Sequence, residues 1–264
     1  PPEIRQADLS GLFLTLAVWG DSDGSASPWP DPPEEERKGE ALRLLRDLGA
    51  VDEKVLPTEK GETMARMPVA PRLASMLVEA GPAFYCASES ASRAALRTAA
   101  ITAAILEHGD PLRPQLRETY GADLELRVEL LERAAEGGGL PADLSKGAAE
   151  RILKEARRLE GLADASSTAG AGTAENAGAE SAAASPGALS VKGGRGNERG
   201  EEKLSRSPGA LLLGAYPDRI ARRTEGGRYR LASGPEARLV EGERGFAPEW
   251  VVAGALHRAR RLDA

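Results

Sequence analysis

The sequence is poor in the side chains that usually carry chemistry: its 264 residues include one cysteine, two histidines and 4% aromatic residues. The single cysteine, Cys86, excludes an internal disulfide framework and fits a reducing compartment. Together with His108 and His257 it cannot supply the three or four ligands of an ordinary zinc site without several carboxylates. Neither histidine lies in a pattern that would activate a serine nucleophile. We therefore expect neither a metal site nor a catalytic residue in this chain.

Long hydrophobic runs are also missing, since no apolar segment approaches the roughly 20 residues that cross a bilayer. The chain opens at Pro1 without an initiator methionine, a charged leader or an apolar signal core. We expect a piece of a longer protein that is soluble and intracellular, in the cytoplasm or an organelle, with no membrane partner.

Acidic residues outnumber basic ones overall, and the net charge of −6 argues against coating nucleic acid by bulk charge. The average conceals a basic end. Residues 203–264 carry twelve Lys and Arg against seven Asp and Glu, a balance of +5, so the preceding residues carry −11. A nucleic-acid contact is therefore expected at the C-terminal end, if anywhere.

The first part of the chain has the pattern of a winged helix. Apolar residues recur at helical spacing from Asp8 to Gly20, and a second helix follows Pro33 and ends at Gly49. A short polar-tipped hairpin over 51–56 then precedes a helix capped by Thr58. Helix, helix, hairpin and helix predict a winged-helix unit in residues 1–69.

Residues 70–162 have the pattern of a helical bundle. One helix opens at Pro71 and ends at Gly81, and others span about 88–107, 122–136 and 144–159. The abundance of alanine favours helices and lets neighbouring backbones approach closely. The protein is therefore predicted to be mainly α.

The composition then changes twice. Residues 163–204 lose apolar periodicity to Ala, Gly, Ser, Asn and Glu, which predicts a disordered low-complexity linker. Short strands are predicted at Arg228–Leu231, Ala237–Val240 and Trp250–Ala255, with a turn at Ser233-Gly234-Pro235 between the first two. Residues 205–264 are thus predicted to form part of a small β barrel.

The order of short motifs is more specific than any one of them. The motifs are Pro2-Glu3-Ile4 with Asp8-Leu9, Asp31-Pro32-Pro33, Leu48-Gly49-Ala50, Pro71-Arg72-Leu73, Ala215-Tyr216-Pro217-Asp218-Arg219-Ile220, Gly227-Arg228-Tyr229-Arg230 and Pro248-Glu249-Trp250-Val251. In this order they resemble the C-terminal accessory region of DEAH-box ATP-dependent RNA helicases, and the stretch from 211 to 223 resembles the HrpB branch in particular. The resemblance covers nearly the whole chain apart from the linker.

The resemblance implies the end of the second motor domain and a winged helix in residues 1–69, a so-called ratchet bundle in residues 70–162 and a partial OB-fold in residues 205–264. It further implies a parent enzyme that couples ATP hydrolysis to movement along single-stranded RNA, with the motor domains of the same polypeptide as partners. The sequence contains neither a G-x-x-x-x-G-K-[ST] loop nor an Asp-Glu-x-His box. We therefore expect ATP and Mg²⁺ to serve the full-length parent, and no cofactor in this chain.

Five arginines in the best-matched region are the expected RNA contacts: Arg219, Arg222, Arg223, Arg228 and Arg230. Guanidinium groups bind phosphates through paired hydrogen bonds and stack on bases. The alternative is that these arginines form surface ion pairs with Asp218, Glu225 and Glu236. Tyr216 and Trp250 could also stack on bases, but aromatics this scarce are expected in the core. The same holds for Met64, Met67 and Met76.

Two other functions remain open from the residues. One is a winged-helix regulator that binds DNA, which would need a basic recognition helix in the major groove. The helix after the hairpin and the segment from Arg37 to Asp47 both have mixed charge, which disfavours it. The other is a scaffold that binds a protein partner and does not contact RNA.

Overall fold

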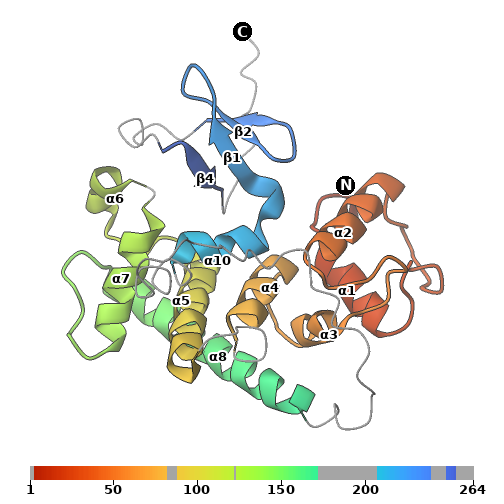
Figure 1. Ribbon diagram of the computed structural model, residues 1–264, viewed down its shortest axis with the longest axis horizontal. Helices are drawn as coiled ribbons and strands as arrows, with labels where there is room; N and C mark the ends of the chain where they lie inside the picture. Colours follow the sequence, from red (N-terminus) through yellow and green to blue (C-terminus); the bar gives the residue numbers. More distant parts are fainter. Residues whose placement is uncertain (1–2, 82–87, 122, 172–206, 239–247, 254–264) are drawn as a thin grey trace, which may run out of the picture.

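The computed structural model describes residues 3–81, 88–121, 123–171, 207–238 and 248–253. Over these residues the protein is mainly helical, with a small antiparallel sheet of four strands near the C-terminal end (Figure 1), which confirms the predicted fold class. None of the described helices is both long and apolar enough to cross a membrane. Cys86, His257 and the predicted linker beyond residue 171 lie outside the described residues.

Three helices form the part predicted as a winged helix: α1 (Ser10–Val18), α2 (Glu35–Asp47) and α3 (Glu59–Ala65), after a 3-10 turn, η1 (Glu3–Arg5). The predicted cap is present, since the Thr58 hydroxyl accepts the Gly61 N–H at 3.0 Å. The predicted hairpin reduces to a single bridge between Val51 and Pro57. The reason is local: the Asp52 carboxylate accepts the N–H groups of Lys54 and Leu56, both at 2.8 Å, in place of a strand partner.

The bundle consists of α4 (Pro71–Ala80), α5 (Glu89–His108), α7 (Leu124–Ala135) and α8 (Lys146–Ala171), with a short helix α6 (Pro114–Tyr120) that the sequence did not predict. Helices α5 and α8 lie side by side (Figure 1). Their contact is close because Ala95, Ala99 and Ala103 of α5 are fully buried. Helix α8 continues beyond the predicted boundary at 162, and Ala163 is still buried. The predicted linker, which starts at 163, therefore overlaps the end of this helix.

Helix α10 (Pro208–Ala215) packs on α4, α5 and α7. Its residues Leu211, Leu212 and Ala215, together with Tyr216, join one contiguous core that also holds α1 to α5, α7 and α8. The first residues after the predicted linker thus belong to the helical body, although they were grouped with the β region. The winged-helix part and the bundle share this core, so a domain boundary at 69 remains a prediction.

The sheet has the strand order β3-β2-β1-β4, with β1 at Ile220–Arg223, β2 at Tyr229–Leu231, β3 at Glu236–Ala237 and β4 at Trp250–Val252. All pairings are antiparallel, and the predicted turn joins β2 to β3. The described strands form an open sheet, not a barrel. Strand β1 was not predicted, yet it is central. The ends of the predicted strands at Val240 and Ala255 lie outside the described residues.

The scarce large side chains are divided between core and surface. The predicted burial of Met64, Met67, Met76 and Tyr216 is confirmed. The prediction for Trp250 was wrong, because 57% of this residue is exposed. It begins an edge strand, and the register of that strand turns it to the outer face of the sheet.

Candidate nucleic-acid interface

Strand register places Arg222, Arg230 and Trp250 in one row across the sheet, which we call the outer row. Arg222 on β1 is opposite Arg230 on β2 and opposite Trp250 on β4. Residues directly opposite in antiparallel strands project from the same face. The side chains of Arg222 and Arg230 are 63% and 66% exposed. Two cations and an aromatic ring, separated in sequence, therefore share one solvent-facing surface.

The other face of the sheet explains why these arginines point outward. Ala221, Tyr229 and Leu231 are buried there in a small apolar cluster, against Val251 among others. Because successive strand residues alternate between faces, burial of Ala221 and Leu231 turns Arg222 and Arg230 to solvent. The Tyr229 hydroxyl donates to the carbonyl of Pro248 at 3.0 Å, which ties β2 to the segment before β4.

Acidic neighbours balance part of the positive charge. Arg222 Nη2 lies 3.1 Å from Glu249 Oε1, and the Arg222 guanidinium lies over the Trp250 ring at 5.4 Å from its centroid. Glu236 is shared, since Arg228 Nη1 and Arg230 Nη2 lie 3.3 and 3.5 Å from its carboxylate oxygens. Exposed pairs of this kind contribute about 0–1 kcal/mol, so a phosphate can replace the carboxylate at small cost.

The five predicted arginines do not form one surface. Arg222, Arg228 and Arg230 come together around Glu236 and the outer row. Arg223 is opposite Tyr229 and thus belongs to the other face. Arg219 lies at the base of the sheet, only 25% exposed, with its guanidinium 4.9 Å from the Tyr216 ring centroid. The ion pairs expected as the alternative exist with Glu236 and, for Arg219, with Asp218 at 3.9 Å.

A junction of four residues connects the sheet to the helical body: Arg72, Tyr216, Asp218 and Arg219. Arg72 of α4 donates to both carboxylate oxygens of Asp218, at 2.6 and 2.9 Å, and to the carbonyl of Ala215 at 3.1 Å. Its guanidinium also lies 5.1 Å from the Tyr216 ring centroid. Burial raises the pKa of the Tyr216 hydroxyl, so it stays neutral. In the sequence Arg72 is only part of a motif, because no local pattern pairs it with Asp218, 146 positions away.

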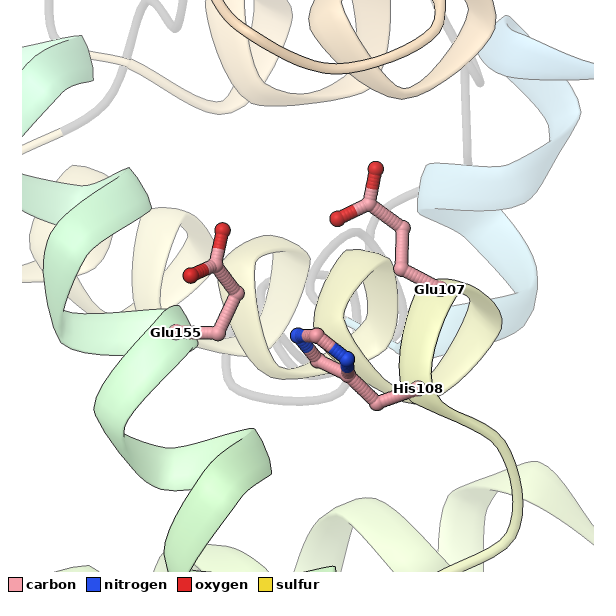
Figure 2. A group of neighbouring side chains, drawn as sticks. All are labelled: Glu107, His108 and Glu155. Carbon is pink, nitrogen blue, oxygen red and sulfur yellow. The ribbon is translucent and has the colours of Figure 1, made fainter.

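A second cluster of titratable groups lies in the helical bundle, where the end of α5 meets α8. Glu107 and His108 end α5 and face Glu155 of α8 (Figure 2), with one possible ligand atom from each within 4.8 Å of the others. Burial raises the pKa of the Glu107 carboxyl, and the nearby charge of Glu155 adds to this.

Arg158 occupies the Glu155 side of that cluster. Its Nε donates to the two Glu155 oxygens at 3.1 and 2.9 Å, and its Nη2 donates as well. This bonding lowers the pKa of the Glu155 carboxyl. A divalent ion would have to displace a guanidinium and take three partly exposed ligands, so we assign no metal to the cluster. The ion pair recorded there, Arg158 with Glu155, lies within α8.

Comparison with known proteins supplies the class. No family model matches the chain. It is 32% identical over 256 residues to the ATP-dependent RNA helicase HrpB of Escherichia coli, an alignment that covers 97% of this chain and 23% of HrpB. It is 36% identical over 86 residues to the HrpA homolog, also an ATP-dependent RNA helicase, of Haemophilus influenzae, over 30% of this chain and 7% of that protein. Among solved structures, the crystal structure of E. coli DEAH/RHA helicase HrpB matches with a TM-score of 0.58 and 28% identity, over 98% of this chain and 24% of HrpB.

The helical body with its small C-terminal sheet is therefore similar to a region of DEAH-box RNA helicases. More narrowly, the chain is homologous over nearly its whole length to HrpB-type DEAH RNA helicases. It spans about a quarter of the length of the HrpB to which it is similar.

Proposed function

We propose that this chain is the accessory RNA-binding region of an ATP-dependent RNA helicase. In this proposal the parent enzyme couples ATP hydrolysis to RNA translocation or unwinding. ATP and Mg²⁺ bind the motor domains of the same polypeptide, and the described helices and sheet hold single-stranded RNA against that motor. The homology to HrpB supports the class, and the surface chemistry of the sheet supports the RNA contact.

The observation that carries the RNA contact is the gathering of Arg222, Arg228 and Arg230 on one exposed face. Each arginine side chain is at least half exposed, and each pairs with a carboxylate that is itself solvent-accessible. Arginines on the exposed face of a sheet can reach phosphates that follow one another along a flexible strand. The local balance is modest, because Glu236 and Glu249 neutralise two of the three charges. The contact is therefore expected to be weak without the motor.

The regulator alternative gains nothing from the fold. Helix α3 has Glu59 and Glu62 in its first turn and only seven residues, and α2 begins with Glu35 and Glu36. Neither helix presents the basic N-terminal turn that a recognition helix needs against DNA phosphates. No observation favours a scaffold role over RNA binding.

The test is a binding assay with fluorescent single-stranded RNA of about 12 nucleotides, a length within the range that one OB-fold-sized surface covers. The test variant is Arg222→Gln with Arg230→Gln. The control variant is Arg93→Gln with Arg133→Gln, which removes two exposed, ion-paired arginines from the bundle. Duplex DNA serves as the competing ligand, and affinity is measured over a series of salt concentrations.

We expect preferential RNA binding that weakens with salt. Each phosphate neutralised on a single strand contributes about −0.7 to the slope of log affinity against log salt, so loss of two contacts should reduce that slope by about 1.4. The control variant should keep the wild-type slope. Equal binding by both double variants, or a preference for duplex DNA, would contradict the proposed interface.

A further inference from the structure

We propose that Trp250 is a stacking platform for one base of the bound RNA, while Arg222 and Arg230 hold the neighbouring phosphates. This rests on the proposed function and adds to it a contact that is not electrostatic. It also assigns a role to the aromatic residue that the sequence places in the core.

The exposure of Trp250 is the first observation. Large aromatic rings normally gain more from burial than any other side chain, and their polar edge normally finds a partner. Trp29 behaves in this way: it is half-buried and its Nε1 donates to the Gly24 carbonyl at 2.7 Å. Trp250 instead remains 57% exposed on a strand whose next residue, Val251, packs against the inner cluster of the sheet. The strand register, not a lack of apolar space, puts this ring in solvent.

The contact between Arg222 and Trp250 is the second observation. A planar guanidinium lies over the indole ring at 5.4 Å, which is the arrangement of a cation–π pair. One ring face thus carries a planar cation, and a base that stacks on the indole would place its own phosphate close to that cation. Bases stack on aromatic rings regardless of sequence because every base has a π face.

The shape of the surface is the third observation. A shallow, open hollow beside Trp250 is lined by Ile220, Arg222, Arg230, Leu231 and Ala232 among others. The lining also includes Arg223, Thr224 and Glu249, so three arginines and one carboxylate surround the hollow. A flat, open surface of this kind suits a base and its sugar-phosphate better than an enclosed small molecule.

Stacking and phosphate binding leave different signatures. Removing a stacking ring lowers affinity at every salt concentration by about the same factor, because no counterion is released. Alanine substitution of a stacking aromatic lowers affinity by about 5- to 150-fold. Removing Arg222 should instead change the slope against salt by about 0.7.

The experiment compares Trp250→Val, which keeps a strand-forming residue, with Trp250→Phe, which keeps a ring, and with Trp19→Val, which removes an exposed tryptophan from the end of α1. The affinity of each variant is measured for uridine oligomers of about 12 nucleotides and for matched oligomers with abasic positions. In the wild type and in Trp250→Phe, tryptophan fluorescence is also recorded during RNA titration. That reading does not depend on a destabilising variant.

The proposal expects Trp250→Val to bind at least about 5-fold more weakly with an unchanged salt slope, and Trp250→Phe to recover most of the loss. Abasic RNA should bind wild type and Trp250→Val alike, and RNA should quench wild-type fluorescence more than that of Trp250→Phe. A contrary result would be RNA binding with the arginine-dependent salt slope and an affinity that changes neither with Trp250 substitution nor with missing bases. That result overturns the stacking role and leaves the proposed function standing. If no RNA binds any variant, both are overturned.

Discussion

The junction between sheet and helical body is the contact most open to a quantitative test. Arg72 is 12% exposed and donates two charge-assisted hydrogen bonds to Asp218, which is 35% exposed. We consider Arg72→Met, which keeps the apolar stem of the side chain and removes its charge, and Asp218→Asn, which keeps the shape of the carboxyl group.

The magnitude follows from the number of bonds and their burial. A hydrogen bond to a charged group contributes about 1.5–3 kcal/mol when buried. Solvent screens the partly exposed Asp218 carboxylate, which reduces this contribution. The cation–π contact with Tyr216 adds about 0.5–1 kcal/mol. We therefore expect Arg72→Met to lower the free energy of unfolding by about 3 kcal/mol and Asp218→Asn by about 1.5 kcal/mol, with a coupling of about 1.5–2 kcal/mol between them.

The assay is urea unfolding of the wild type, the two single variants and the double variant, followed by far-ultraviolet circular dichroism. The exposed pair of Arg133 and Glu129, one helical turn apart on α7, provides a matched cycle with Arg133→Met and Glu129→Gln. That coupling should be about 0.3–0.5 kcal/mol. A coupling for Arg72 and Asp218 no larger than the surface pair would refute the view that this junction fixes the sheet on the body.

Two further outcomes concern the core. Burial opposes ionisation of Asp110, but hydrogen bonds and charges from Arg127 outweigh it and lower its pKa below the ordinary 3.8. Wild type should therefore be more stable than Asp110→Asn by the full amount above that pH. The difference in the free energy of unfolding should disappear as pH falls through the lower pKa of the folded state, as measured by urea unfolding from about pH 7 to about pH 3. A Cβ on Gly61 would fall on the Ala50 carbonyl oxygen, so Gly61→Ala should cost about 1–3 kcal/mol, whereas Gly39→Ala, with open space around it, should gain about 1 kcal/mol. The melting temperatures of the two variants measure these effects. Equal shifts for Gly61→Ala and Gly39→Ala would contradict the packing described.

The sequence alone determined the helices and much of the core. Apolar spacing, Pro71 at a helix start and Thr58 at a cap act within a few residues, so the positions of α4 and α5 and the burial of the three methionines could be predicted. The order of the motifs also predicted the similarity to HrpB-type DEAH RNA helicases.

Only the tertiary structure decided the rest. In the sequence, strand β1 has the pattern of a basic segment. It becomes a strand through pairing with β2 and β4, and no local pattern predicts these partners. The end of α8 was predicted too early because alanine carries no periodic signal, although Ala163 packs in the core. Strand register, a property of paired chains, separated Arg222 and Arg230 from Arg223 and turned Trp250 to solvent. The five predicted arginines lie in three places: on the exposed face of the sheet, on its opposite face and at the partly buried junction. Side chains alternate across a sheet, and long-range ion pairs form only after folding.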